Sequence, residues 1–590
     1  MSRGVMEKQG LNQRKLLMCN EEKQTIERDD DGFNSNSMDR ISQLPESVLH
    51  HILSFLSQKE ATQTCLLAKS WRHVSSTRPN IEFLEENWFK GNKVAFLSVL
   101  DKTLQRYHDQ MLRIQEFRVK ISKLDSESIS LLEKWIPIIM VNMGVRTFNL
   151  DLFSNTWELF DLPSVVFKAE SLQKLDLLGC KLNIQNPLNK VQFKHLQTLH
   201  LTQVYIDDET FHKIISSCPL IEVVSLNACE GLRTIKMNKG HNLKKFDFSD
   251  VTWDTRDTRL DDDCSIEIDV QTIETIKISG DNHWYHQHNY LPHLKSLNLI
   301  DVRLASWPFD IFSCNYLPSL QDLIVRNCSG LTELQLSNHS IKHLTIEGLD
   351  RPGNKASIDA PNIVKFEYVG NIPPSFAFAT TFSEWKSDIT LDVNAYFDDD
   401  DHDLLSQFLK LNDLLKEVSR SEISLTLVQH RHRNRHIAYF CGGLCKPVVV
   451  EHLSLRGFYA SSCFPDFLNC LFRICRPRYI DMFLHANPLD DWERQDMEIT
   501  EFFCKNLLIR ERERTHYFWQ RALEEVSLES FDDKGQEWHH VVREGTSLFE
   551  IAAAFPIQPT KYNIFRSEQL IRIRLKWREI KNMSRLAPKI

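Results

Sequence analysis

The chain has 590 residues, of which 42% are hydrophobic, and its formal net charge is -9 at pH 7. This length exceeds what one hydrophobic core usually organises, so we expect several domains or an elongated array of repeats. The acidic balance argues against general binding to nucleic acid or to an acidic membrane surface. Its 14 cysteines are too dilute for a secreted disulfide scaffold, and several occupy apolar periodic positions, which is typical of reduced thiols inside cells.

Residues 1–37 are polar, and we interpret them as a disordered lead. Their apolar run Leu16–Cys19 is too short for a secretory signal, and the run Trp135–Val141 is far shorter than a membrane-spanning helix. We therefore expect no membrane association and a location in the cytoplasm, the nucleus or both.

Residues 38–83 are expected to form three short helices. Pro45 suits a first helical turn, and apolar residues then recur at helical spacing as far as Leu56. A second helix is predicted over residues 59–67, with Ala61, Cys65 and Leu66 facing inward, and a third over 68–74 around Trp71. These apolar positions are too many for one inward face of so small a segment, so the rest of the chain or a partner must cover some of them.

Three motifs occur in this segment: Leu44-Pro45, Ile52-Leu53-Ser54-Phe55-Leu56 and Lys69-Ser70-Trp71-Arg72. With them the segment resembles the F-box of plant F-box proteins that carry leucine-rich repeats of the RNI-like type. The family usually reads Ser-Lys-Arg-Trp at the last motif, where this sequence has Ala68 and Ser70.

The resemblance implies docking onto a Skp-type adaptor and, through it, onto a cullin ubiquitin ligase. It implies that the adaptor contacts come from Leu44, Pro45, Leu49, Ile52, Leu53, Phe55, Leu56, Leu67 and Trp71. The remaining apolar residues of the segment would seat it on the rest of the chain. The alternative is that these helices merely cap the repeats that follow.

A phrase of the form apolar-x-x-apolar-x-apolar returns at intervals of 21 to 31 residues. Its copies begin at Ile114, Val145, Leu172, Leu196, Ile221, Leu243, Ile273, Leu294, Leu320, Ile341 and Ile363. This is the period of leucine-rich repeats with insertions, in which each phrase forms a strand. A window opened by Asp207-Asp208-Glu209 is expected to form a helix between two strands.

The expected fold is therefore α/β: a leucine-rich-repeat solenoid shaped as a horseshoe over residues 92–370, preceded by the small F-box. In residues 371–590 the phrase returns at Val450 and helices are expected over 403–418, 464–475 and 497–519. We interpret this region as degenerate repeats and a C-terminal cap. Its last segment, Leu570–Arg578, alternates apolar and basic residues, and we predict an exposed edge strand there rather than a nucleic-acid contact.

The concave face of such a solenoid is the surface most suited to recognition. Its expected target contacts, at the middle x of successive phrases, are Asp176, His200, Ser225, Asp247, Lys277 and Asn298. Their charges nearly cancel, which favours a protein or small-molecule target over nucleic acid.

Sequence motifs of nucleotide-binding loops, serine hydrolases and zinc proteases are absent, so we expect no catalytic residue and no cofactor. His432, His436, Cys441 and Cys445 could in principle form a zinc shell, but the loose spacing and intervening arginines favour a solvated basic loop. Asp261–Asp263 and Asp398–Asp401 lack the spacing of a calcium loop, and the aromatic and histidine cluster His283–His288 is explained by loop packing better than by partner anchoring.

The function that these patterns indicate is that of a non-enzymatic subunit that recruits a protein target to a cullin ubiquitin ligase. Two alternatives stay open. One is a repeat scaffold without a role in ubiquitin transfer, and the other is a metal-dependent or hydrolytic enzyme in the C-terminal third.

Overall fold

The computed structural model describes residues 41–66, 69–88, 92–153, 159–183, 191–238, 242–250, 264–285, 290–304, 312–331, 333–349, 354–371, 373–379, 384–393, 404–429, 446–458, 464–485, 491–503, 518–532, 537–543 and 568–578. The chain divides into one unit that ends at Arg78 and a second that begins at Pro79. The N-terminal lead predicted at residues 1–37 lies outside the described residues.

The first unit is helical. It contains α2 (Glu46–Ser54), α3 (Gln58–Gln63), a 3-10 turn η1 (Thr64–Leu66) and α4 (Lys69–Ser76). Pro45 immediately precedes α2 and accepts the first helical hydrogen bonds through its carbonyl oxygen. Ser57 and Glu60 form a reciprocal capping box at the start of α3, which fixes where that helix begins.

A small core holds these helices together. It consists of Leu49, Leu53, Ala61, Trp71 and Val74, with Ile52 and Leu56 packed against its rim. The Trp71 indole N–H donates to the Ser42 hydroxyl at 2.7 Å, which ties α4 to the segment before α2. The prediction that Leu66 faces inward is wrong, because its side chain is 74% exposed at the end of η1.

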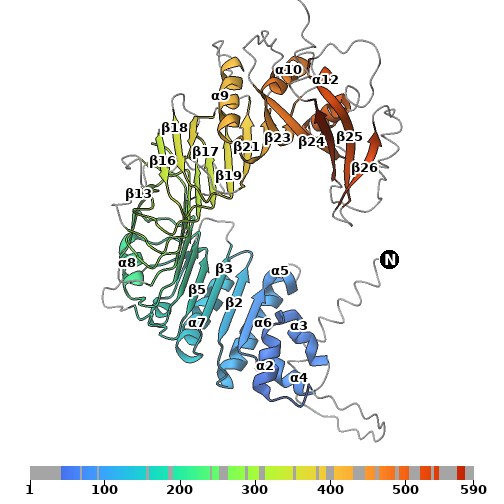
Figure 1. Cartoon of the computed structure of the whole chain (residues 1–590). Coiled ribbons are helices and arrows are strands. Elements are labelled where there is room, and N and C mark those ends of the chain that lie inside the picture. The colour runs from blue at the N-terminus through green and yellow to red at the C-terminus, as the bar shows by residue number, and fades with distance from the viewer. Residues whose placement is uncertain are drawn as a thin grey trace, which may run out of the picture. The chain divides into compact units, whose positions relative to one another are not determined.

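The second unit is organised by one large sheet, whose strands lie side by side in Figure 1. Its parallel strands are β1 (Asn80–Leu84), β2 (Glu116–Ile121), β3 (Thr147–Leu152), β5 (Lys174–Leu178), β7 (Thr198–Thr202), β8 (Val223–Asn227), β10 (Lys245–Ser249), β12 (Thr275–Ser279), β14 (Ser296–Ile300), β15 (Asp322–Arg326), β17 (His343–Glu347), β19 (Lys365–Gly370), β21 (Lys386–Asp392), β22 (Glu422–Val428), β23 (Val448–Arg456) and β24 (Cys475–His485). Each of the predicted phrases coincides with one of these strands. Strand β1 contains Asn80–Phe83, so the predicted F-box boundary at residue 83 runs into the sheet.

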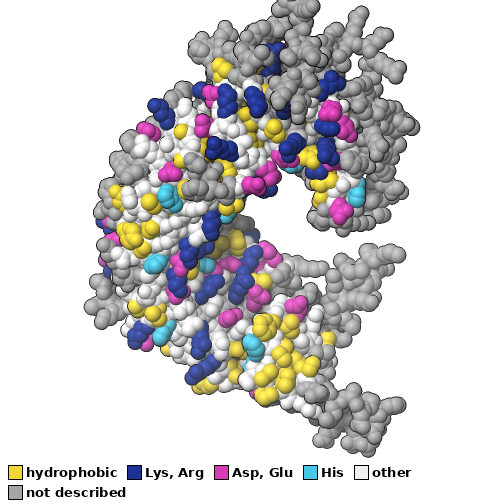
Figure 2. All heavy atoms as spheres, in the orientation of Figure 1, with side chains coloured by type: hydrophobic (Ala, Val, Ile, Leu, Met, Phe, Trp, Pro, Cys, Tyr) yellow, Lys and Arg dark blue, Asp and Glu magenta, His cyan; other side chains and the backbone are white. Residues whose placement is uncertain are grey.

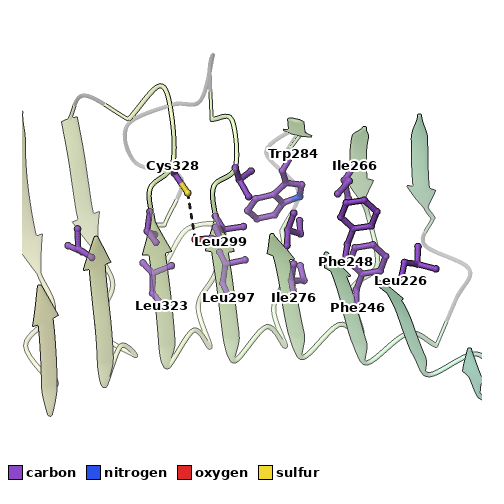
Figure 3. Packing of buried hydrophobic residues seen from close by; sticks show 14 of the residues in the cluster. Leu226, Phe246, Phe248, Ile266, Ile276, Trp284, Leu297, Leu299, Leu323 and Cys328 are labelled. Carbon is purple, nitrogen blue, oxygen red and sulfur yellow. Dashed lines mark hydrogen bonds between the residues drawn. The ribbon is translucent and has the colours of Figure 1, made fainter. Parts of the chain in front are cut away.

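The repeat phrase produces this sheet because its last two apolar positions alternate with polar ones and face one core. Corresponding residues are register partners in neighbouring strands, as Phe246 is of Ile276 and Ile276 of Leu297. Figure 3 shows these side chains in a row that runs from one strand to the next. A single repeat could not bury such a face alone, so the stacking of neighbours stabilises every copy.

A left-handed residue ends many of the strands. Gln203 follows β7 with φ of 50°, and its N–H donates to the carbonyl of Asn227 at the end of the next strand. The same bond joins Gly179 to Thr202 and Asp301 to Arg326. At this turn the chain leaves the sheet at the same position in each of these repeats, so the ends of the strands are aligned.

Helices and short strands connect the long ones. The helices are α5 (Glu85–Trp88), α6 (Lys93–Asp109), α7 (Ser126–Asn142), α8 (Asp208–Ser216), α9 (Leu404–Glu417), α10 (Phe464–Ile474), α11 (Asp491–Phe503) and α12 (Phe518–Arg521), with a 3-10 helix η2 (Ser164–Lys168). The helix predicted after Asp207 is α8, and the Asp207 carboxylate caps it by accepting from the Thr210 N–H at 2.7 Å. Small sheets not predicted from the sequence are formed by β4 (Phe160–Asp161) with β6 (Cys180–Lys181), by β9 (Thr234–Met237), β11 (Ser265–Ile268) and β13 (His283–Tyr285), and by β16 (Glu333–Ser337), β18 (Lys355–Asp359) and β20 (Ser375–Phe378).

The last strands reverse direction. Strand β27 (Glu568–Trp577) pairs antiparallel with β24 on one side and with β25 (Leu523–Asp532) on the other, and β26 (Glu537–Arg543) pairs with β25. The strand predicted over residues 570–578 is confirmed as β27, but the expectation that it lies at an exposed edge is wrong. The basic residues of β27 find cross-strand partners instead, such as Glu529 for Arg572 at 2.6 Å.

Candidate functional site

The helical unit exposes a set of apolar side chains that its own core does not use. The exposed fractions are 55% for Ile41, 37% for Leu44, 40% for Val48, 76% for Phe55 and 74% for Leu66. Figure 2 shows hydrophobic side chains gathered over the helical unit. We call these five residues, with the exposed Pro45, the apolar helical surface. Covering such a surface is favourable by about 25 cal/mol per Å² of apolar area removed from water.

The predicted adaptor contacts separate into two groups. Leu44, Pro45 and Phe55 belong to the apolar helical surface, and Ile52 and Leu56 are half-buried beside the core. Leu49, Leu53 and Trp71 are buried in that core, with 2%, 0% and 5% of their surface exposed, so here they support the helices from within. Leu67 lies outside the described residues.

Ile41, Val48 and Leu66 were not among the predicted contacts. A signal for the first two is present in the sequence, because residues 41, 44, 48, 52 and 55 recur every three or four positions and mark one stripe. Leu49 and Leu53 lie four residues apart and mark a second stripe. The structure turns the second stripe into the core and leaves most of the first stripe exposed.

The predicted target contacts all lie side by side in the large sheet. In the strand ladders Asp176 is opposite His200, His200 is opposite Ser225 and Ser225 is opposite Asp247. Asp247 is opposite Lys277, and Lys277 is opposite Asn298. All six side chains are half-buried on the same face of the sheet, opposite to the hydrophobic core. We call this ladder the register row and the side of the sheet that carries it the row face.

The register row extends beyond these six residues in both directions. Its other members are Arg118 and Asn149 on one side, and Ile324, Thr345, Glu367, Asp388, Ser424 and His452 on the other. The row therefore presents one residue from each of many consecutive strands.

Electrostatic interactions within the row face are local. Burial raises the pKa of Asp176, but the neighbouring His200, with Nδ1 at 3.8 Å from the carboxylate, and Lys174 outweigh burial, so the pKa is lowered. Burial raises the pKa of Asp151, and the Asp176 carboxylate raises it further. Two carboxylates whose pKa values shift in opposite directions thus lie on the neighbouring strands β3 and β5.

Several buried cysteines of the described residues offer little nucleophilic chemistry. Burial raises the pKa of Cys218 and of Cys264 to about 12, and it raises the pKa of Cys180 still further. Such thiols stay protonated at neutral pH and behave as small apolar side chains. Cys328 illustrates this, since its Sγ donates to the Leu299 carbonyl at 3.6 Å within the core (Figure 3).

Within the described residues no group of three or more His, Cys, Asp and Glu side chains could hold a metal ion. His432, His436, Cys441 and Cys445, and the runs Asp261–Asp263 and Asp398–Asp401, lie outside those residues. Of the cluster at 283–288, Trp284 is 2% exposed and packs in the core in Figure 3. In the same described part of the chain, no helix has the length and apolar character needed to cross a bilayer.

Two family models match the chain. One describes the F-box domain and matches residues 41–82, and the other describes the leucine-rich repeats of FBD-associated F-box protein At5g56370 and matches residues 132–267. F-box/LRR-repeat protein 25 of Arabidopsis thaliana is 30% identical over 213 residues, which cover 36% of this chain and 76% of that protein. The chain belongs to the plant F-box/leucine-rich-repeat family. The F-box match covers its helical unit, and the leucine-rich-repeat match covers strands β3 to β10 of its large sheet.

A second relative is matched over a smaller share of its own length. Putative F-box/LRR-repeat protein At3g18150 of Arabidopsis thaliana is 29% identical over 217 residues, 37% of this chain and 44% of that protein. The chain thus spans less than half the length of that relative. A solved leucine-rich-repeat ectodomain, from the Arabidopsis thaliana receptor kinase GASSHO1/SCHENGEN3, is similar over 58% of this chain and 53% of its own, with 12% identity and a TM-score of 0.16, too low to support a common arrangement.

Proposed function

We propose that the protein is the substrate-recognition subunit of an SCF-type cullin ubiquitin ligase. Its F-box docks onto a Skp-type adaptor, and its repeats bind a protein target. The observation that carries this proposal is the apolar helical surface of the F-box, where Phe55 is 76% exposed. Soluble proteins rarely expose adjoining apolar side chains unless a partner covers them.

The division of the first helix explains how so small a unit could serve both folding and docking. Leu49 and Leu53 are buried in the F-box core and hold α2 in place, while Leu44, Val48 and Phe55 remain available to a partner. Burying one such side chain fully is worth about 1.5–3 kcal/mol, so a few of them could supply a specific interface. We infer that Leu49, Leu53 and Trp71 affect adaptor binding through the fold of the F-box.

The repeats supply the target side of the proposal. Strands stacked in register favour a curved solenoid with the row face on its concave side, and the mixed charges of that face suit a protein better than nucleic acid. A target held beside the ligase reacts at a high effective concentration. The chemistry of ubiquitin transfer belongs to the partner proteins, so this chain needs no catalytic residue and no cofactor, and it acts in the cytoplasm, the nucleus or both.

Co-purification with a Skp-type adaptor tests the proposal. The full chain is expected to retain the adaptor, whereas Leu44→Ala with Pro45→Ala, or Phe55→Ala alone, weakens retention by about tenfold or more because apolar area is lost from the interface. Val94→Ala is the matched control, since Val94 is 71% exposed on α6 in the other unit. Equal retention by all of these variants would place the adaptor elsewhere.

A second measurement separates the ligase from a scaffold that binds proteins without directing ubiquitin transfer. The chain, the adaptor and a cullin ligase are reconstituted, and turnover of proteins bound by the repeats is compared with and without residues 41–78. The ligase function predicts that turnover is lost with the F-box. Unchanged turnover would support the scaffold.

A further inference from the structure

Charge pairing on the row face differs between the middle and the later strands of the sheet. On β15, β17, β19, β21 and β22 most of the charged side chains of this face have partners on a neighbouring strand. Asp322 pairs with His343, Arg326 with Glu347, Lys365 with Asp388 and Lys386 with Glu422, and Glu367 accepts from the Thr345 hydroxyl.

Strands β10 and β12 lack such pairing. Lys245 and Asp247 stand two residues apart on β10, and Lys277 stands opposite Asp247 on β12. Among the described residues none of the three makes an ion pair or a side-chain hydrogen bond, although Asp247 and Lys277 are adjacent in the ladder. Lys245 is exposed, and Asp247 and Lys277 are half-buried. We call these three residues the unpaired triad.

The strands on either side of the triad carry no charge on this face. Strand β8 contributes Val223, Ser225 and Asn227, and β14 contributes Ser296, Asn298 and Ile300. The Asn298 side-chain oxygen is shielded from solvent without a hydrogen-bond partner in the described structure. A surface of hydroxyl and amide groups costs less to desolvate than charged groups, and it can adapt its hydrogen bonds to a partner.

We propose that the unpaired triad is the centre of target recognition and that it takes a protein segment in which acidic residues flank a basic one. This inference rests on the proposed function and narrows it to four strands, β8, β10, β12 and β14. A charged side chain of the target can form an ion pair with an unpaired residue without breaking an existing one. At the paired positions of β15 to β22 it would have to displace an existing partner and desolvate both.

Charge and spacing select the partner. Two ammonium groups and one carboxylate give the triad a net positive charge, so a segment with two carboxylates and one cation complements it. Lys245 and Asp247 are about 6.7 Å apart along one strand, and Lys277 is about 4.8 Å from Asp247 across the ladder. An extended chain repeats its side chains on one face at nearly the first of these distances, so an acidic and a basic side chain of the segment can face Lys245 and Asp247. The second acidic side chain of the segment then reaches across the ladder to Lys277. A lone phosphate fits less well, because the Asp247 carboxylate would repel it.

Peptide selection provides the test. The full chain, prepared with its Skp-type adaptor, is used to select binders from a displayed library of random peptides, and the charges of the enriched peptides are compared. Wild-type protein is expected to enrich peptides with excess Asp and Glu around a Lys or Arg. Their affinity should fall about tenfold or more between low salt and about 0.5 M salt, because the contacts are solvent-accessible ion pairs.

Two charge reversals of equal size decide where selection occurs. Lys277→Glu should lower the affinity of the enriched acidic peptides about tenfold or more and shift new selection toward basic peptides. Lys386→Glu, on the same face but at a paired position of β21, should change affinity by no more than about twofold. Equal effects of both variants, or the absence of charge preference, would overturn the inference.

Adaptor retention is recorded in the same preparations. Retained adaptor together with absent peptide selection would reject the triad while leaving the ligase function standing. Adaptor lost from wild-type protein would instead count against the ligase function, and peptide selection by the chain alone would still decide the role of the triad.

Discussion

Gly179 stands where the chain leaves β5, and its geometry leaves no room for a side chain. Its φ is 73°, and a Cβ there would lie 2.1 Å from the carbonyl oxygen of Leu152 on the neighbouring repeat. The close approach of the two backbones is part of the turn that aligns the strand ends.

We predict that Gly179→Ala destabilises the repeats by more than the conformational cost of a left-handed residue, which is about 1–2 kcal/mol. Gly144→Ala is the control, because Gly144 has a φ of 68° and nothing within 4 Å of the added Cβ. The midpoint of urea unfolding, followed by circular dichroism, should fall more for Gly179→Ala than for Gly144→Ala. Equal shifts would show that the neighbouring backbone yields.

Protonation of His452 makes the stability of the fold depend on pH. A hydrogen bond to the Asp481 carboxylate at 2.9 Å raises its pKa above the ordinary value of 6.5 and outweighs burial, which lowers it. A raised pKa means that the folded state binds the proton more tightly than the unfolded state. The resulting stability is complete below about pH 6.5 and is lost as the pH rises through the folded-state pKa.

Thermal unfolding measured between about pH 5.5 and pH 8.5 should therefore show a fall in stability on the alkaline side that Asp481→Asn removes. His343→Gln is the control variant, because it removes a histidine on the same face whose side chain is 53% exposed. If the pH profile of Asp481→Asn equals that of the wild-type protein, the pair of His452 and Asp481 does not cause the fall in stability.

At the scale of elements, β27 shows how an alternating basic strand can lie inside a sheet. Arg572 pairs with Glu529 on β25, and the guanidinium lies 4.2 Å from the ring centre of Tyr479 and 4.0 Å from that of Trp538. The side chains of Glu529 and Arg572 are 5% and 15% exposed. Because Glu529 is buried, it depends on its cation to offset the cost of desolvation.

We predict that Arg572→Ala destabilises the C-terminal strands by about 3–5 kcal/mol, because it leaves the buried Glu529 carboxylate without its cation. Lys576→Ala on the same strand removes an exposed pair with Glu524 and should cost about 0–1 kcal/mol. Hydrogen exchange of the β25 and β27 amides measures both. Similar protection in the two variants would mean that Arg574, 4.0 Å from Glu529, replaces the lost partner.

The sequence predicts the repeated strands more completely than the elements between and after them. Each phrase of the repeat predicts a strand, because two apolar positions in every copy must face one core. Strand β24 was missed because Arg476, Pro477 and Arg478 interrupt its apolar pattern, and its neighbours β23 and β27 supply the pairing that the local sequence does not indicate. Short strands such as β13 hold too few residues to show a period.

The sequence predicts the arrangement of the register row better than it predicts which F-box residues are exposed. The ladder of Asp176 to Asn298 follows from phrase spacing alone, since equal positions in equal repeats must become register partners. In the F-box, periodicity marked the apolar residues of α2 but did not separate those that are buried from those that are exposed. That choice depends on Trp71 and Val74 in α4, which pack against Leu49 and Leu53.

At the scale of the whole molecule, the F-box and the repeats have separate hydrophobic cores. We predict that a chain beginning at Pro79 keeps the folded sheet, because β1 stays with its partner β2. Its thermal midpoint should lie within about 2–4 °C of that of the full chain, the shift expected for about 1 kcal/mol. A chain beginning at residue 84 loses β1 and should unfold at a lower temperature; equal midpoints would show that β1 is dispensable.

The unbroken register of the strands limits how the row face can change its length. Removing one complete repeat brings two distant strands together and moves every later row position by one strand spacing, about 4.8 Å, without turning any side chain over. Removing a single residue inside β12 would instead send Lys277 and its neighbours to the opposite side of the sheet. Insertions and deletions are therefore compatible with binding when they fall in the connections, or when they add or remove a whole repeat.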